Sequence, residues 1–147
     1  MRVAGSAAFI LMVLVCGLAP SPPRNSGAQR PDWELVRSVS NPYGGTVDLV
    51  LVPEPKKRDM NHYTEIANAI CGNRTTCMVM FWTDRKRVPK TIDMPVPDLQ
   101  VMTATYEREP SYHEPVLKLA CWLYPNKAAA ESEHCFYMLG VVLPWEK

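Results

Sequence analysis

The sequence lacks an excess of charge of either sign. It contains 16 Lys and Arg residues against 15 Asp and Glu residues in 147 positions. Proteins that bind nucleic acid by electrostatic attraction usually carry a strongly basic surface. The balanced charge therefore argues against nucleic acid as a partner.

Apolar runs of membrane-spanning length are also lacking. Residues 7–19 form an unbroken apolar run of 13 residues, whereas a helix needs about 20 residues to cross a bilayer. A short run that follows Arg2 is typical of the apolar core of a signal peptide. Small residues at Ser26 and Ala28 predict cleavage after Ala28. We therefore expect residues 1–28 to be a signal peptide and the mature chain to have no membrane span.

Two other interpretations of the N-terminus stay open at this point. Lipidation of Cys16 needs a small residue before it, and Val15 stands there instead. An uncleaved membrane anchor is disfavoured because the apolar run is short. Cleavage removes Arg2 and Arg24, which leaves 14 of the 16 basic residues against 15 acidic residues. The sequence thus predicts a secreted or periplasmic domain that is close to neutral.

The cysteines do not follow a redox or zinc pattern. No Cys-x-x-Cys pair of a thiol oxidoreductase is present, and the spacings do not match zinc thiolate sites. Without Cys16, four cysteines remain: Cys71, Cys77, Cys121 and Cys135. An even number in a small exported domain indicates two disulfides. Four cysteines allow three pairings, and the short spacings favour Cys71–Cys77 with Cys121–Cys135.

Hydrophobic patterning predicts strands over residues 46–52, 76–82 and 115–123. The second segment is apolar on both alternating faces, which is typical of a central strand covered on both sides. Residues 135–139 are expected to be a fourth strand or an extended segment. We expect the domain itself to cover residues 46–147, after an N-terminal arm over residues 29–45.

A helix is predicted between the first two strands, beginning at Asp59 or Asn61 and ending near Ile70. Its apolar side chains recur at helical spacing, and Gly72 follows where a left-handed residue often ends a helix. A second helix is predicted over residues 99–107, because Leu99, Met102 and Tyr106 share one helical face. One further helical turn is expected over residues 128–133. The fold class is therefore α+β, with a three- or four-stranded sheet and two helices.

The sequence contains few features of a hydrolase or a metal site. No Gly-x-Ser-x-Gly or His-Glu-x-x-His segment occurs, and the histidines, His62, His113 and His134, are scattered. A metal site built from His113, Glu114 and His134 and a copper site built from methionines such as Met78 and Met80 stay as alternatives. We expect no cofactor, and the chemistry of a small secreted hydrolase with a His or carboxylate base is the main alternative to binding.

Two basic clusters follow the predicted first and central strands. If these strands are parallel neighbours, both clusters lie at one sheet edge, where open α/β sheets bind ligands. Trp82, at the end of the central strand, adds an aromatic group, with Tyr43 and Tyr63 nearby. The sequence therefore predicts binding of an anionic glycan, an envelope polymer or an acidic protein. The cluster residues are Lys56, Lys57, Arg58, Arg85, Lys86 and Arg87.

Overall fold

A computed structural model describes residues 31–41, 45–91, 93–137 and 143–146. The described residues belong to one compact unit, Pro31–Lys147. The predicted signal peptide, its cleavage site and Tyr43 lie outside the described residues. Within the described ranges, no helix is long and apolar enough to cross a membrane.

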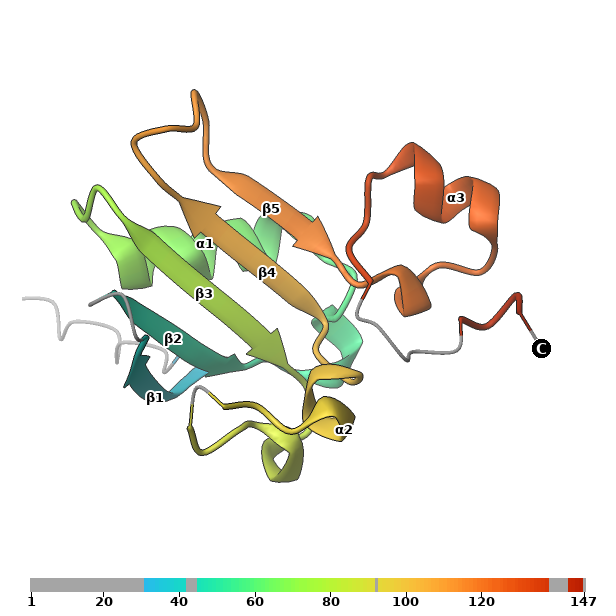
Figure 1. Ribbon diagram of the computed structural model, residues 1–147, viewed down its shortest axis with the longest axis horizontal. Helices are drawn as coiled ribbons and strands as arrows, with labels where there is room; N and C mark the ends of the chain where they lie inside the picture. The colour runs from blue at the N-terminus through green and yellow to red at the C-terminus, as the bar shows by residue number, and fades with distance from the viewer. Residues whose placement is uncertain (1–30, 42–44, 92, 138–142, 147) are drawn as a thin grey trace, which may run out of the picture. The chain divides into compact units, whose positions relative to one another are not determined.

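The unit is built on one five-stranded sheet in the order β1-β2-β3-β4-β5 (Figure 1). Strands β2 and β3 are parallel, and every other neighbouring pair is antiparallel. A small α+β domain was predicted and is confirmed, but the sheet has five strands rather than three or four. The strands are β1 (Glu34–Ser40), β2 (Thr46–Leu51), β3 (Cys77–Trp82), β4 (Ala104–Arg108) and β5 (Val116–Leu119).

Helix α1 (Met60–Cys71) connects β2 to β3 and covers one face of the sheet (Figure 1). It begins where predicted, because the Asp59 carboxylate accepts a hydrogen bond of 3.1 Å from the backbone N–H of His62. This bond satisfies a donor that has no partner within the helix. The helix ends at Gly72, whose φ of 51° suits glycine better than any residue with a Cβ atom.

The predicted helix over residues 99–107 is wrong. Only a four-residue helix, α2 (Val96–Leu99), forms there, and β4 follows it. β3 has hydrogen-bonding edges on both sides, so β4 pairs with the edge that β2 leaves open. Ala104 and Tyr106 point into the core with exposures of 0% and 2%. Their alternation with half-buried neighbours is the strand period, and the helical spacing of residues 99–106 is coincidental.

The predicted N-terminal arm contains a strand. β1 pairs antiparallel with β2 along its whole length, with a register shift between Leu35 and Arg37. It is an edge strand, and its side chains are exposed or only half-buried. Such a strand has a weak hydrophobic pattern, because neither of its faces is fully covered.

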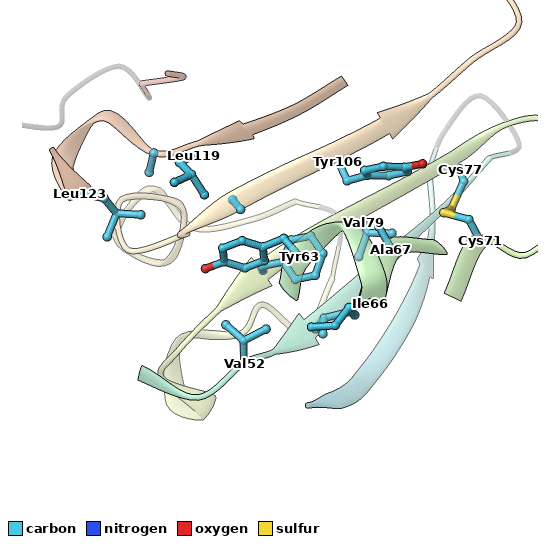
Figure 2. Close-up of a cluster of buried hydrophobic side chains, with 14 residues drawn as sticks. Val52, Tyr63, Ile66, Ala67, Cys71, Cys77, Val79, Tyr106, Leu119 and Leu123 are labelled. Carbon is cyan, nitrogen blue, oxygen red and sulfur yellow. A yellow bond between two sulfur atoms is a disulfide. The ribbon is translucent and has the colours of Figure 1, made fainter. Parts of the chain in front are cut away.

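Apolar side chains pack on both faces of the sheet. Under α1, the larger cluster includes Tyr63, Ile66, Val79 and Phe81 (Figure 2). On the opposite face, Leu49 and Trp82 pack with side chains from the connection between β3 and β4. That connection holds a short 3-10 helix, η2 (Arg85–Arg87), and α2. The double coverage of β3 confirms its prediction as the central strand.

Both predicted disulfides are present. Cys71 is bonded to Cys77 across the turn between α1 and β3, with a Cα–Cα distance of 5.8 Å. Cys121 is bonded to Cys135, with a Cα–Cα distance of 5.0 Å. The second bond closes a segment that holds η3 (Cys121–Leu123) and α3 (Lys127–Ser132), the helical turn that was expected near residues 128–133.

Candidate functional site

A hollow of about 360 Å³ lies where the parallel strands β2 and β3 end. The two strand ends are joined directly, since the Val52 N–H donates a hydrogen bond of 2.8 Å to the Trp82 carbonyl. The hollow is therefore at the sheet edge where the sequence predicted a crevice. Its lining residues are Pro31, Asp32, Trp33, Glu34, Leu51, Val52, Pro53, Glu54 and Thr83.

The Glu54 carboxylate connects the segments that follow the two strands. It lies in η1 (Glu54–Lys56), directly after β2, and forms an ion pair with Lys57. Hydrogen bonds from Lys57 and then from Thr83 hold the pKa of Glu54 below its ordinary value. Lys57 belongs to the basic cluster after β2, and Thr83 lies between β3 and the second basic cluster. The Glu54 carboxylate therefore connects the two segments that carry the clusters.

Four of the six cluster cations have carboxylate partners. Lys57 pairs with Glu54 and Arg85 pairs with Glu34, two carboxylates that line the hollow. The other two pairs are Lys56 with Asp59 at 3.1 Å and Arg87 with Asp98 at 3.4 Å. Within the part of the chain that the structure describes, Arg58 and Lys86 have no carboxylate partner.

These ion pairs also lower the pKa values of carboxylates at this edge. The hydrogen bond from Arg85 lowers the pKa of Glu34. The N-cap bond from the His62 N–H, and then Lys56, lower the pKa of Asp59. With their lowered pKa values, Glu34, Glu54 and Asp59 are ionised at neutral pH, and they partly neutralise the clusters that the sequence brings to this edge.

Two of the three aromatic residues predicted near the site, Trp82 and Tyr63, lie inside the molecule. Trp82 has an exposure of 0%, and its indole N–H donates a hydrogen bond of 2.9 Å to the Asp98 carbonyl. Tyr63 has an exposure of 0% as well. Trp33 lines the hollow instead and is half-buried. It comes from the segment before β1, which the sequence offered no reason to place beside β2.

One histidine lies next to the hollow. The His62 Nε2 atom is buried and has no hydrogen-bond partner among the described residues. The nearest carboxylate oxygen is Oδ1 of Asp32, at 3.5 Å. His62 and Asp32 are therefore close enough to form an ion pair when the imidazole is protonated.

One apolar cluster of the described residues holds four methionines of the copper alternative, Met78, Met80, Met94 and Met102, but no histidine. Met78 and Met80 pack in the apolar cluster around Trp82, while His62 lies on the opposite face with α1. His113, Glu114 and His134 are exposed. Within the described ranges, no three His, Cys, Asp or Glu side chains are grouped as metal ligands.

A second hollow, of about 260 Å³, lies where the start of α1 faces the disulfide-bonded C-terminal segment. Arg58 is the one cluster residue among the side chains that line it. Segments at least 59 positions apart in the sequence meet here. No local pattern in the sequence indicates this hollow, because only the folding of β5 and η3 against α1 creates it. Its lining residues are Arg58, Met60, Leu119, Leu123, Tyr124 and Glu133.

The geometry of the carboxyl-end edge favours binding at its surface. Its cations lie in short exposed segments, and its ion pairs are accessible to solvent. No family model, curated protein or solved structure matches this chain. The functional inference therefore depends on the charges and hollows of the molecule itself.

Proposed function

We propose that this chain is an exported, non-enzymatic binding domain that engages an anionic partner in the cell envelope or the extracellular space. The contact surface is the cationic edge, defined as the six cations of the two basic clusters. The observation that carries the proposal is the parallel pairing of β2 with β3, since both clusters follow carboxyl ends that are hydrogen-bonded to each other. The edge consists of Lys56, Lys57, Arg58, Arg85, Lys86 and Arg87.

The existing ion pairs do not oppose this function strongly. The side chains of the Arg85–Glu34 pair are 55% and 51% exposed, and those of the Lys56–Asp59 pair are 46% and 37% exposed. Exposed ion pairs such as these contribute little to stability, because solvent screens the two charges. An anionic partner can therefore replace the protein carboxylates at little cost. Arg58 and Lys86 need no such exchange.

The acids inside the hollow indicate what kind of anion binds. Asp32, Glu34 and Glu54 repel a small anion that enters the hollow. A polymer or a protein surface with spaced negative charges contacts the cations around the rim and avoids these acids. An anionic glycan, an envelope polymer or an acidic protein fits this requirement better than a free phosphate or carboxylate. At physiological salt, the electrostatic effect of each charge extends only about 8 Å. The negative charges of the partner must therefore lie close to the cations of the rim.

Export is supported by the two disulfides and by the signal-like N-terminus. Disulfides persist in oxidising compartments and are rare in the reducing cytosol. Both bonds here staple short segments of a small domain. A secreted or periplasmic location is therefore part of the proposal.

The test uses dextran sulfate as a polyanionic probe and isothermal titration calorimetry at low salt. Lys86→Glu and Arg58→Glu reverse the two cations that lack a carboxylate partner, so neither variant breaks an ion pair. Each is expected to weaken binding several-fold. Lys127→Glu in α3 is the control for the same charge change, should bind like the wild type, and gives up only an exposed ion pair with Glu131 at 3.6 Å. Equal binding by all three variants and the wild type would rule the proposal out.

A second candidate function follows from the His62–Asp32 pair. A histidine next to a carboxylate beside a hollow is the arrangement of a general base. The hollow is lined by Thr83 but by no serine or cysteine, so the base would activate water rather than a protein nucleophile. A panel of chromogenic ester and glycoside substrates tests this function. Hydrolysis that disappears in His62→Gln supports it, and no turnover by the wild type rejects it.

A further inference from the structure

The hollow beside the first turn of α1 has an apolar floor. Leu119 and Leu123 are 5% and 2% exposed and belong to the core cluster under α1. Figure 2 shows them at one end of this cluster, beyond Tyr63. Met60, also in the lining, is a large apolar side chain that stays 40% exposed. Because the two leucines are already buried, a ligand with an apolar group gains free energy mainly by covering Met60, at roughly 25 cal/mol per Å².

The lining also carries two opposite charges that do not pair with each other. Arg58 and Glu133 both line the hollow and are exposed. No ion pair joins them, and Arg58 has no carboxylate partner among the described residues. Opposite charges around an apolar floor, held apart, leave room for a ligand that complements both.

The Tyr124 phenol shows that both charges act on this hollow. Burial and then the Glu133 carboxylate raise the pKa of Tyr124, while the Arg58 guanidinium lowers it. The Tyr124 hydroxyl is therefore close enough to both Arg58 and Glu133 for each charge to affect its pKa. This phenol adds a neutral hydrogen-bonding group to the two charges.

We propose that this hollow binds a zwitterionic amino acid with an apolar side chain. Arg58 binds the α-carboxylate, since a guanidinium matches a carboxylate with two parallel hydrogen bonds. Glu133 binds the α-ammonium group. The apolar side chain of the ligand covers the exposed part of Met60, above the floor that Leu119 and Leu123 form. The site goes beyond the cationic edge and shares only Arg58 with it.

The volume and the charges select this ligand class over others. About 260 Å³ is below the roughly 300–1,000 Å³ of pockets for drug-sized molecules, which indicates a small ligand. A fatty acid or another anionic amphiphile would bring its carboxylate close to Glu133 as well as to Arg58. A simple amine would be repelled by Arg58. Only a ligand with both charges forms an ion pair with Arg58 and with Glu133. A ligand with a single charge is disfavoured by repulsion from the side chain of like charge.

The first experiment titrates the full chain with four probes by calorimetry. L-leucine carries both charges and an apolar group, N-acetyl-L-leucine lacks the ammonium, L-leucinamide lacks the carboxylate, and glycine lacks the apolar side chain. Each missing contact is expected to weaken binding about tenfold or more relative to L-leucine. N-acetyl-L-leucine that binds as tightly as L-leucine identifies an anion site and contradicts the proposal. Absence of L-leucine binding overturns it as well.

The second experiment uses Arg58→Gln and Glu133→Gln, with Lys127→Gln as the control. The first two are expected to bind L-leucine about tenfold more weakly, and the control to bind like the wild type. All three positions are exposed, so the unfolding midpoints should match and confirm intact folding. Wild-type affinity in both site variants would overturn the proposal.

Failure of this site and failure of the cationic edge can be told apart. Glu133→Gln removes an acid outside the cationic edge, so this variant should keep its binding to dextran sulfate while it loses L-leucine. A chain that binds L-leucine but not dextran sulfate refutes the cationic edge and keeps the amino-acid site. The opposite result refutes the amino-acid site and keeps the edge.

Discussion

The Arg74 guanidinium lies 2.7 Å from the carboxylate of Asp48, whose side chain is only 4% exposed. Arg74 belongs to the turn closed by the Cys71–Cys77 disulfide, and it also donates to the carbonyl of Ile70 at 2.8 Å. Asp48 lies in β2 and accepts a further hydrogen bond from Ser38 in β1. This ion pair therefore ties the turn after α1 to the first two strands.

Arg74→Met is expected to destabilise the protein by about 2–4 kcal/mol, because it leaves a buried carboxylate without its cation. Chemical denaturation measures the loss. The exposed Arg37, whose guanidinium donates to the Lys90 carbonyl, provides the control, and Arg37→Met should cost less than about 1 kcal/mol. The double variant Arg74→Met with Asp48→Leu should recover much of the loss, since no buried charge then remains unpaired. A double variant that is less stable than the single one contradicts this account.

Because of the buried Tyr63, we expect the folded protein to lose stability in alkali. Its hydroxyl donates a hydrogen bond of 3.1 Å to the Lys57 carbonyl, and burial is the main cause that raises its pKa to about 12. The raised pKa stabilises the folded protein fully below pH 10, the ordinary pKa of tyrosine, and this contribution is lost as the pH rises toward 12. The loss amounts to about 2 kcal/mol at pH 12.

Tyr63→Phe isolates this effect, because the variant has no phenol to ionise. It should be less stable than the wild type by about 1 kcal/mol at neutral pH, where the hydrogen bond is lost. The difference should shrink above pH 10, change sign near about pH 11 and reach roughly 1 kcal/mol in favour of the variant at about pH 12. Urea denaturation of both proteins at each pH measures it. A difference that stays constant from pH 7 to 12 would show that Tyr63 does not titrate in this way.

His134 ends α3 in a conformation that glycine prefers. Its φ is 48°, and the two hydrogen bonds of a Schellman motif run from His134 to Glu131 and from Cys135 to Ala130. His134→Gly should therefore stabilise the protein by about 0.5–1 kcal/mol, whereas His134→Val should destabilise it. Thermal unfolding of the two variants measures both effects. Destabilisation by His134→Gly would show that the imidazole itself contributes more than the backbone conformation costs.

Removal of the Cys121–Cys135 disulfide tests how the C-terminal segment is held. The paired change Cys121→Ala with Cys135→Ala reopens a loop of 14 positions, which corresponds to about 3 kcal/mol by loop entropy. The double variant should unfold at lower denaturant concentration and lose L-leucine binding, because Leu119, Leu123 and Glu133 are no longer held together. Unchanged stability would show that packing of η3 and α3 suffices without the bond.

The sequence predicts the central part of this fold well, because the signals there are local. The cap at Asp59, the apolar stripe of α1 and Gly72 all lie within one short segment. β3 is apolar on both faces, and its neighbour β2 is nearly so. β1 is not predicted, because an edge strand with few buried side chains lacks a clear hydrophobic pattern. The segment that forms β4 is predicted to be a helix, because three apolar residues happen to have helical spacing.

The candidate site is predictable only in part, for the same reason. The shared edge of the two basic clusters follows from the parallel pairing of β2 with β3, which a strand-helix-strand pattern predicts. The pairing of Arg85 with Glu34 spans 51 positions, and no local pattern reveals it. The burial of Trp82 likewise depends on the connection that folds back over β3. Tertiary contacts thus determine which cations of the two basic clusters have no carboxylate partner among the described residues and can bind an anionic partner directly.

The central claim is that cations from both clusters act together on one anionic partner. Its most direct test is the affinity for dextran sulfate from about 50 to 300 mM salt, measured by calorimetry for the wild type and for the double variant Arg58→Glu with Lys86→Glu. Wild-type affinity is expected to fall steeply as salt rises, and the double variant is expected to bind weakly with a flat salt dependence. Wild-type affinity that does not change with salt, or identical curves for the two proteins, would contradict the claim.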